Sequence, residues 1–153
     1  MPIVESSGTI AASQDRVFAV TQDYYLRQEW DPFLRQIKFL DGATQAAAGV
    51  RVWVKAKNGL AMTVEYLVVQ PPSHVAVKMV KGPFFFEQFG GAWRFEPMTP
   101  EQTHVRFRYS FRTRWPVLRP ILDPIIRLVF ARDVRARILG LKHFMEEQAH
   151  RVR

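Results

Sequence analysis

Residues 10–33 read IAASQDRVFAVTQDYYLRQEWDPF, and this stretch decides how the rest of the chain must be arranged. Ser13 is a good N-cap, so a helix is expected to begin at about Gln14. Pro32 disfavours the helical conformation in the residue before it and ends the helical segment near Trp30. Short helical structure therefore separates a first strand from a long β region.

The β region consists of runs of alternating polarity that end at turn signals. The expected strands cover residues 3–10, 33–40, 50–57, 60–70, 74–80, 84–97 and 103–114. Asn58-Gly59 between two alternating runs is the strongest short hairpin signal, so residues 50–57 and 60–70 should pair antiparallel. Because the connections are too short for parallel crossovers, we predict one antiparallel sheet of seven strands.

A single long helix is expected after the strands. Asp123 followed by Pro124 is typical of an N-cap with proline at the first helical position, so the helix should run from there to about Gln148. One apolar stripe at helical spacing consists of Ile126, Phe130, Val134, Ile138, Leu141 and Met145. The arginines expected on the opposite, solvent-facing side are Arg127, Arg132, Arg135 and Arg137.

Alternation along the strands predicts one sheet face that is rich in aromatic side chains. The expected inward sets are Val105, Phe107, Tyr109, Phe111 and Thr113, then Phe89, Gly91, Trp93 and Phe95, and finally Met62, Val64, Tyr66 and Val68. Gly90-Gly91 within a strand predicts a bulge or a bend, which a curling sheet needs. Rigid rings on a curved sheet pack imperfectly against one helix, so we expect a pocket of roughly 300 to 1,000 Å³.

The candidate ligand-binding residues are the large side chains expected to face this pocket. They are Phe18, Trp30, Met62, Tyr66, Phe89, Trp93, Phe107, Tyr109, Phe111, Ile126, Val129 and Phe130. Ordinary core packing is the competing interpretation for each of them. Tyr66 and Tyr109 are the strongest candidates, because a buried phenol needs a hydrogen-bond partner that a ligand oxygen could supply.

Composition limits the class of protein. The 153 residues are 48% hydrophobic and contain no repeats or linkers, which predicts a single domain over residues 1–153. The chain has no cysteine, which excludes disulfides, thiol catalysis and zinc–thiolate sites. No secretory signal or spanning helix is recognised, so a cytoplasmic location is expected.

Charge is distributed unevenly along the chain. The first 105 residues hold ten basic and ten acidic residues, whereas residues 106–153 hold twelve basic and four acidic ones. This pattern fits either a solvated surface or a positive end that meets an anionic membrane surface or an acidic carrier protein. Trp115-Pro116-Val117-Leu118-Arg119-Pro120 mixes apolar anchors with arginine, as an interfacial segment would. Nucleic acid is the less favoured partner, because no nucleic-acid-binding motif is present.

Signals for catalysis are few. No nucleophile elbow, phosphate loop or dinucleotide fingerprint occurs, and no cofactor is predicted. His143 with Glu147 and Glu146 with His150 have a spacing that could hold a metal, but a solvated helix face is the favoured interpretation and no metal site is predicted. The inward strand positions contain no carboxylate or histidine for acid–base work. Asp31 is the only acid expected near a cavity mouth, with a turn or capping role as the alternative.

The order of elements carries a family resemblance. A strand, two short helices ending at a Trp, six antiparallel strands and a long final helix follow one another, and residues 91–97 form a Gly-x-Trp-x-Phe-x-Pro segment ahead of Thr103-His104-Val105. The whole chain thereby resembles the START-like (SRPBCC) superfamily. This group includes polyketide cyclases/dehydrases, lipid and coenzyme Q binding proteins, and plant pathogenesis-related and birch-pollen-allergen proteins.

The resemblance implies an α+β helix-grip fold. In that fold a seven-stranded curved antiparallel sheet wraps a long C-terminal helix, two short helices lie between strands 1 and 2, and an elongated apolar cavity remains inside. It does not imply one chemistry, since members range from carriers to enzymes. We therefore expect binding, or binding and transport, of a hydrophobic small molecule such as a lipid, isoprenoid or polyketide in the cavity. The alternative is a polyketide cyclase or dehydratase in which Tyr66 or Tyr109 polarises a carbonyl. The oligomeric state is not predicted.

Overall fold

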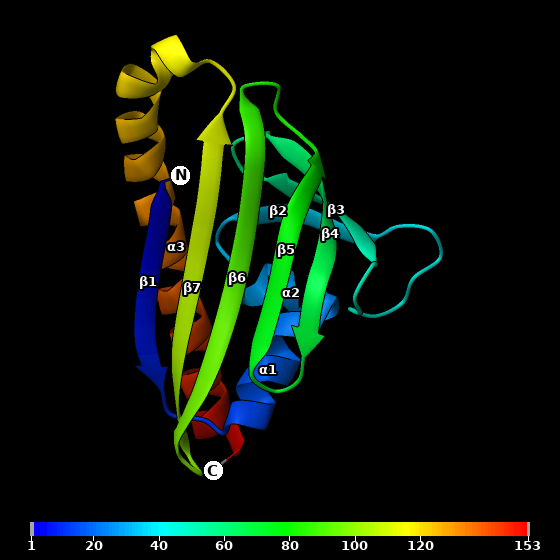
Figure 1. Ribbon diagram of the computed structural model, residues 1–153. Helices are drawn as coiled ribbons and strands as arrows, with labels where there is room; N and C mark the ends of the chain where they lie inside the picture. The colour runs from blue at the N-terminus through cyan, green and yellow to red at the C-terminus, as the bar shows by residue number, and fades with distance from the viewer. Residues whose placement is uncertain (1, 153) are drawn as a thin grey trace.

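The chain folds as one curled antiparallel sheet that packs against a long C-terminal helix (Figure 1). The computed structural model describes residues 2–152, without the side chains of residues 28 and 148–152. The strands are β1 (Ile3–Ile10), β2 (Leu34–Phe39), β3 (Arg51–Ala56), β4 (Ala61–Gln70), β5 (His74–Lys81), β6 (Phe86–Thr99) and β7 (Gln102–Thr113). The helices are α1 (Gln14–Gln22), α2 (Tyr24–Trp30), the 3₁₀ turn η1 (Pro116–Leu118) and α3 (Arg119–Val152).

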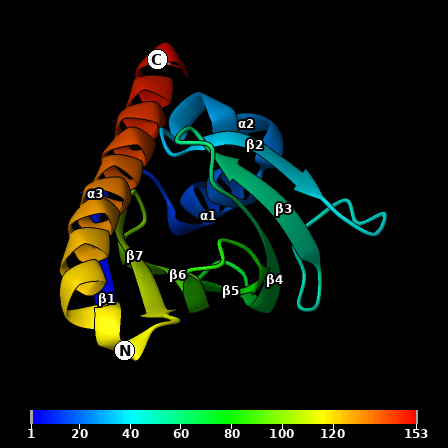
Figure 2. The same cartoon turned by 90° about the horizontal axis from the view of Figure 1, so that it is seen from above.

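The sheet order is β1-β7-β6-β5-β4-β3-β2, so β1 crosses to pair with the last strand. Seen from above, the sheet curves from β1 and β7 beside α3 round to β3 and β2, with α1 and α2 across one end (Figure 2). This is the helix-grip arrangement that the resemblance implied, and the prediction of seven antiparallel strands is confirmed.

Local signals explain the two short helices. The Ser13 hydroxyl accepts a hydrogen bond from the backbone N–H of Arg16 at 3.4 Å and caps α1, as predicted. Asp23 ends α1 and also caps α2, because its carboxylate accepts from the N–H of Tyr25 at 3.0 Å. The helical segment is therefore divided at Asp23 and ends at Trp30.

Strand pairing follows the sequence pattern, with two local differences. The β3–β4 hairpin at Asn58-Gly59 is present as expected. A register shift beyond Tyr66 in β4 breaks the expected alternation, so Val69 packs against the core in place of Val68. A bulge or a bend was expected at Gly90-Gly91, and the bulge is absent, since the pairing of these residues with β7 is uninterrupted. The β6 register shifts come at its two ends instead.

The long helix begins earlier than predicted. Helix α3 starts at Arg119, directly after η1, and Pro124 lies inside it. A proline this close to the N-terminus removes the donor for one carbonyl only, so the helix tolerates it. Asp123 is not the N-cap. Its carboxylate accepts from the Thr113 hydroxyl at 3.1 Å and fixes the start of α3 to the end of β7.

The C-terminal half of α3 is anchored in the core. Val134, Ile138, Leu141 and Met145 are buried, as the apolar stripe predicts. Gly140 allows α3 to approach the end of α2 closely, because a Cβ at this position would lie 2.4 Å from the Trp30 carbonyl oxygen. Among the described residues, no helix combines the length and the hydropathy needed to cross a membrane.

Candidate functional site

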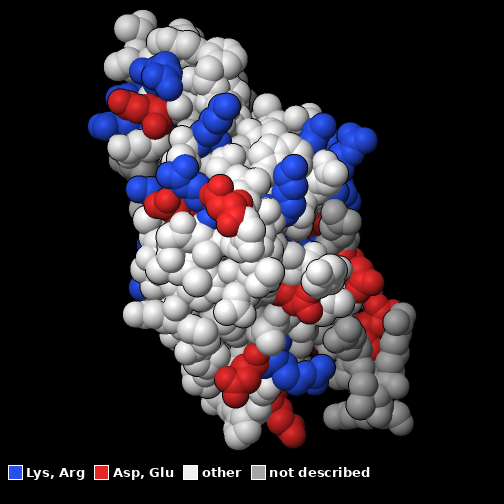
Figure 3. Space-filling model, turned by 90° about the vertical axis from the view of Figure 1, so that its right-hand side faces the viewer, with Lys and Arg blue, Asp and Glu red and all other residues white. Residues whose placement is uncertain are grey.

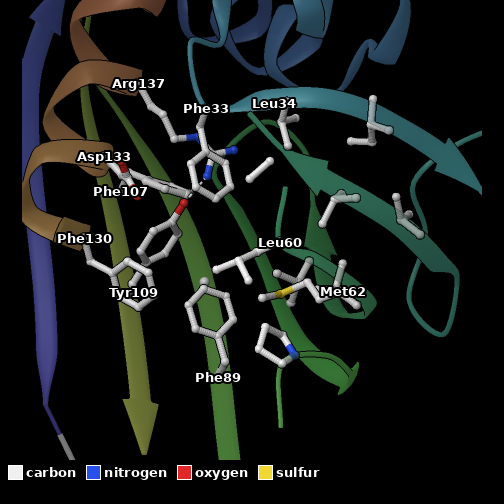
Figure 4. A pocket seen from close by; sticks show the side chains of 18 of the residues that line it. Phe33, Leu34, Leu60, Met62, Phe89, Phe107, Tyr109, Phe130, Asp133 and Arg137 are labelled. Atoms are coloured by element: carbon white, nitrogen blue, oxygen red, sulfur yellow. Dashed lines mark hydrogen bonds between the residues drawn. The ribbon is translucent and has the colours of Figure 1, made fainter. Parts of the chain in front are cut away.

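A pocket of about 260 Å³ lies between the concave face of the sheet, the middle of α3 and the end of α2 (Figure 4). This volume is slightly below the expected range. Every helix and strand contributes to the wall of the pocket except β1 and the turn η1. Helix α1 contributes only its last residue, Gln22. Residues from distant parts of the chain therefore meet in one space.

Nine of the twelve candidate residues line the pocket. They are Met62, Tyr66, Phe89, Trp93, Phe107, Tyr109, Ile126, Val129 and Phe130. Whether they bind a ligand stays a prediction, but their position between the sheet and α3 follows the alternation and the helical stripe from which they were chosen.

The other three candidates, Phe18, Trp30 and Phe111, do not line the pocket and pack beside it. Phe18 packs edge-on against Phe95, with the ring centroids 5.5 Å apart. Trp30 makes the same kind of contact with Trp93 at 6.1 Å. Phe111 packs against Phe86 and Phe130, with ring centroids 6.1 and 5.5 Å apart. All three are buried beside the pocket, and for Trp30 and Phe111 the rings that they contact are themselves part of the pocket wall.

The pocket has an apolar entrance. Leu60 on the β3–β4 hairpin, and Ile125 and Val129 on α3, line the pocket and are also exposed to solvent. Pro83 of the β5–β6 connection completes this rim. Inside the rim the wall is formed by aromatic and aliphatic side chains, with Phe89 and Met62 facing the space (Figure 4).

The opposite, deep end is polar, and Arg137 is its central residue. Arg137 is only 6% exposed, so its expected position on the outer face of α3 is wrong. Its Nη2 and Nε donate to one oxygen of Asp31 at 2.8 and 3.0 Å, and its Nη1 donates to the Tyr109 hydroxyl. The guanidinium also lies over the Phe107 ring, 4.6 Å from the centroid.

The sequence contains one signal for the position of Arg137. Arg137 follows Phe130 by seven residues and precedes Leu141 by four, spacings that place all three on the same face of a helix. Arg137 was expected on the solvent-facing side of the helix only because its side chain is charged. A long cationic side chain enters an apolar face only where a buried partner meets it, and that partner is 106 residues away in the sequence.

Asp31 is buried at the deep end and does not lie at the mouth. Its backbone ends α2 through a hydrogen bond from its N–H to the Arg27 carbonyl at 2.9 Å. One carboxylate oxygen accepts from the N–H of Phe33 at 3.0 Å, and the other receives Arg137. The alternative expectation for Asp31, a role in the turn after the helix, is therefore confirmed. Asp31 also orients the Arg137 side chain.

Arg27 is the second buried arginine of the deep end. It lines the pocket, and its Cζ lies 5.1 Å from the Trp30 ring centroid. Its Nε and Nη1 are enclosed and have no hydrogen-bond partner among the described atoms, and its Nε lies 3.6 Å from the Asp31 carboxylate. Burial lowers the pKa of Arg27, and Asp31 offsets part of this effect. For Arg137 burial acts in the same direction, but attraction to Asp31 and Tyr109 outweighs it and raises the pKa.

Three further polar side chains line the wall near this end. The hydroxyls of Tyr24 and Tyr66 share a hydrogen bond, and the Tyr66 hydroxyl also donates to the Gln22 side chain at 3.3 Å. Burial raises the pKa of Tyr24 to about 12, so its phenol is neutral at physiological pH. Tyr66 was expected to seek a partner in the ligand, but the protein already supplies one.

Asp133 supplies the carboxylate that the strand pattern lacked. It lines the pocket from α3, one turn before Arg137, and is half-buried. Burial raises the pKa of Asp133, while Arg137 lowers it and Asp31 raises it further. Among the described residues, Asp133 is the only acid that lines the pocket, and it comes from a helix. The strands contribute no acid to the wall.

Metal chemistry has no support in the described part of the chain, where no group of three or more His, Asp or Glu side chains could hold an ion. His143 and Glu147 form an exposed pair at 3.4 Å. The side chain of His150, the other histidine with suitable spacing, lies outside the described residues.

Comparison with known proteins identifies the family. The family model described as polyketide cyclase / dehydrase and lipid transport matches residues 1–146. The chain belongs to this family. The START-like resemblance inferred from the order of elements is thereby confirmed. No curated protein sequence matches the chain significantly.

Several solved structures share the fold of this chain although their sequences are less than 20% identical to it. A START superfamily protein from Mycobacterium smegmatis has a TM-score of 0.80 at 11% identity, over 95% of this chain and 98% of that one. The ZhuI aromatase/cyclase from Streptomyces sp. R1128 has a TM-score of 0.76 at 19% identity, over 99% and 96%. Norcoclaurine synthase from Thalictrum flavum, solved with dopamine and hydroxybenzaldehyde, has a TM-score of 0.71 at 12% identity, over 95% and 87%.

Proposed function

We propose that this protein binds a hydrophobic small molecule, such as a lipid, isoprenoid or polyketide, in the pocket between the sheet and α3. The observation that carries the proposal is the pocket itself, with an exposed apolar rim and an inner wall of aromatic and aliphatic side chains. Pockets of this character bind most of the surface of a small apolar ligand and orient it through a few polar groups. The family description, which includes lipid transport, supports the same function.

A fluorescence titration tests this proposal. N-phenyl-1-naphthylamine is a neutral, apolar probe whose emission rises in an apolar site, and saturable one-to-one binding is expected. Val77→Trp places an indole in the pocket wall and should abolish most of the signal. Val80→Trp changes the same strand at an exposed position and is the matched control. Absence of saturable binding, or equal binding by both variants, would contradict the proposal.

A second candidate function is a cyclase or dehydratase reaction in the same pocket. The observation that favours it is the Tyr109 hydroxyl, which lines the pocket and accepts a hydrogen bond from Arg137. A phenol that accepts from a charged guanidinium is a stronger donor, and its own proton is directed to another acceptor. Such a donor would polarise a ligand carbonyl and stabilise the enolate that forms during ring closure.

Turnover of a poly-β-ketone thioester mimic distinguishes the two functions. If the protein catalyses cyclisation, Tyr109→Phe should reduce kcat by about ten- to a thousand-fold with little change in KM. Tyr25→Phe alters an exposed phenol outside the pocket and should leave turnover unchanged. No turnover, with intact probe binding, leaves the binding function alone. Unchanged turnover in Tyr109→Phe removes this residue from the reaction.

A further inference from the structure

The deep end of the pocket holds a buried guanidinium, that of Arg27, two of whose nitrogens have no hydrogen-bond partner among the described residues. Arg27 is only 6% exposed, and its Nε and Nη1 have no acceptor among the described atoms. The Asp31 oxygen that lies nearest to Arg27 already accepts two hydrogen bonds, and Arg137 donates both of them. Unpaired buried donors are rare, and each one needs an explanation. An acceptor carried by a ligand would supply the missing partner.

The charges of the deep end favour an anionic acceptor. Arg27 and Arg137 are both fully enclosed, whereas Asp31 is the fully enclosed carboxylate that faces them. Asp133 is the other acid at this end, but it is half-exposed, so solvent screens its charge. The buried groups therefore carry one unbalanced positive charge, which matches a monoanion such as a carboxylate.

We propose that the ligand is a single-chain amphiphile with a carboxylate head, which enters head first and binds the Arg27 guanidinium. This inference deepens, and depends on, the proposed binding function. Reorienting the Arg27 guanidinium toward the head breaks no hydrogen bond at Nε or Nη1, because neither atom has one. The tail then lies along the apolar wall and ends at the rim formed by Leu60, Ile125 and Val129. Planar guanidinium and carboxylate groups are well suited to paired hydrogen bonds.

Displacement of N-phenyl-1-naphthylamine by three ten-carbon compounds tests the head group. The compounds are decanoate, 1-decanol and decyltrimethylammonium, which share a chain and differ in charge. Wild-type protein should bind decanoate at least about ten-fold more tightly than decanol, since hydrogen bonds to charged groups are the stronger ones. In Arg27→Met this preference should disappear while decanol binds as before. Arg16→Met removes an exposed arginine from α1 and should retain the wild-type preference.

The outcomes separate this inference from the proposed function. Equal affinity for decanoate and decanol in the wild type, or a preference that survives in Arg27→Met, overturns the head-group assignment while the binding function stands. Failure of the naphthylamine probe itself to bind overturns both. The far-ultraviolet circular dichroism and thermal midpoint of Arg27→Met show that the variant is folded, so a lost preference cannot come from unfolding.

A second inference is carried by a different surface. Seven exposed apolar residues gather where α3 begins, and we call this surface the apolar tip. It consists of Phe84, Trp115, Val117, Leu118, Ile121, Ile125 and Leu128. Val117 is 88% exposed and Phe84 is 72% exposed. The last four residues follow one another at spacings of three, four and three, which places them on one side of a helix.

The charges beside the apolar tip are mainly positive. Arg112, Arg114, Arg119 and Arg127 come from the end of β7 and the start of α3, against the two acids Glu87 and Asp123. Figure 3 shows Lys and Arg side chains gathered over the half of the molecule that contains this end, with Asp and Glu more frequent in the other half. An exposed apolar group with arginines around it has the composition of a segment that lies in a membrane interface.

We infer that the apolar tip docks on an anionic lipid bilayer. Ile125 belongs both to the apolar tip and to the rim of the pocket, so docking would bring the entrance to the lipid surface. An apolar ligand could then pass between bilayer and pocket without crossing water. This inference does not depend on the identity of the ligand.

Cosedimentation with vesicles tests the docking surface. Wild-type protein should sediment with phosphatidylcholine vesicles that contain phosphatidylglycerol, and less with phosphatidylcholine alone or at high salt. The double variant Val117→Asp with Ile121→Asp should lose at least about ten-fold in partitioning. Leu67→Asp changes an exposed leucine on β4 and is the matched control. No sedimentation of the wild type, or equal loss in the control, overturns the inference, and binding to an acidic protein but not to vesicles also overturns it.

Discussion

The Arg137 guanidinium donates two hydrogen bonds to one carboxylate oxygen of Asp31, at 2.8 and 3.0 Å, and so joins α3 to the end of α2. The pair is fully buried, and Arg137 lines the deep end of the pocket. Buried ion pairs contribute little net stability, yet removing one partner leaves an uncompensated charge. Arg137, which is paired in this way, and Arg27, which has two nitrogens without a hydrogen-bond partner among the described residues, should therefore differ in their effect on stability.

Arg137→Met should lower the free energy of unfolding by about 3–5 kcal/mol, because Asp31 then stays buried without the two hydrogen bonds that Arg137 donates. Arg27→Met should leave stability unchanged or raise it, because the lost side chain carries two unpaired donors. Urea unfolding of both variants measures the contrast. Equal destabilisation would show that Arg27 is also satisfied by the protein and would remove the basis of the head-group inference.

Gly140→Ala should lower the free energy of unfolding by about 1–3 kcal/mol, the usual cost of overpacking, although alanine favours a helix. The added Cβ would meet the Trp30 carbonyl oxygen, a backbone atom that cannot rotate away. Thermal unfolding measures the loss, and Leu139→Ala is an exposed control one residue away. A stabilised Gly140→Ala variant would mean that α2 and α3 are further apart than described here.

Asp133→Asn should stabilise the protein at neutral pH by less than about 1 kcal/mol, since the group is partly exposed. The folded-state pKa of Asp133 is raised above 3.8 by burial, so the folded protein holds its proton more tightly than the unfolded chain. The charge therefore destabilises the fold above the folded-state pKa, and this effect is lost below the unfolded value. Urea unfolding at pH 7 and below pH 3.8 should show a difference between variant and wild type only at the higher pH. A stability difference between Asp133→Asn and wild type that grows as the pH falls would contradict a raised pKa for Asp133.

The phenols of Tyr24 and Tyr109 should titrate near pH 12 in the folded protein, because burial raises both pKa values from 10.0 to about 12. Their contribution to stability is fully present below pH 10 and is lost as the pH rises toward 12. Absorbance at the phenolate band follows the titration, and Tyr24→Phe and Tyr109→Phe should each remove one late-titrating group. Titration of all four tyrosines near pH 10 in protein that is still folded would contradict this burial.

The sequence specified the frame better than the site. The hairpin at Asn58-Gly59, the cap at Ser13 and the inward side chains of β7 depend on local pattern, and each was predicted. The start of α3 was missed because the bond from Thr113 to Asp123 competes with capping and joins residues from two elements. Val68 was misplaced because a register shift leaves no mark in the alternation.

The polar end of the pocket could not be predicted from local pattern. Arg27 and Asp31 lie four residues apart at the end of α2, and they meet Arg137 only because α3 crosses that end. Arg137 was assigned to the solvent-facing side of the helix, Asp31 to a cavity mouth or a turn, and Arg27 was given no role. The helical spacing of Arg137 from Phe130 and Leu141 was the available signal, and it conflicted with the usual cost of burying a charge. The apolar wall, in contrast, followed directly from strand alternation.

The central claim is that an apolar ligand occupies the space between the sheet and α3, and methionine-methyl NMR tests it most directly. Of the five methionines, Met62 lines the pocket, Met145 is buried in the core beyond it, and Met98 is exposed on β6. Titration with N-phenyl-1-naphthylamine should shift the Met62 methyl signal saturably, through the ring current of the probe, and leave Met98 and Met145 nearly unchanged. A saturated probe signal with an unmoved Met62 resonance would contradict the account.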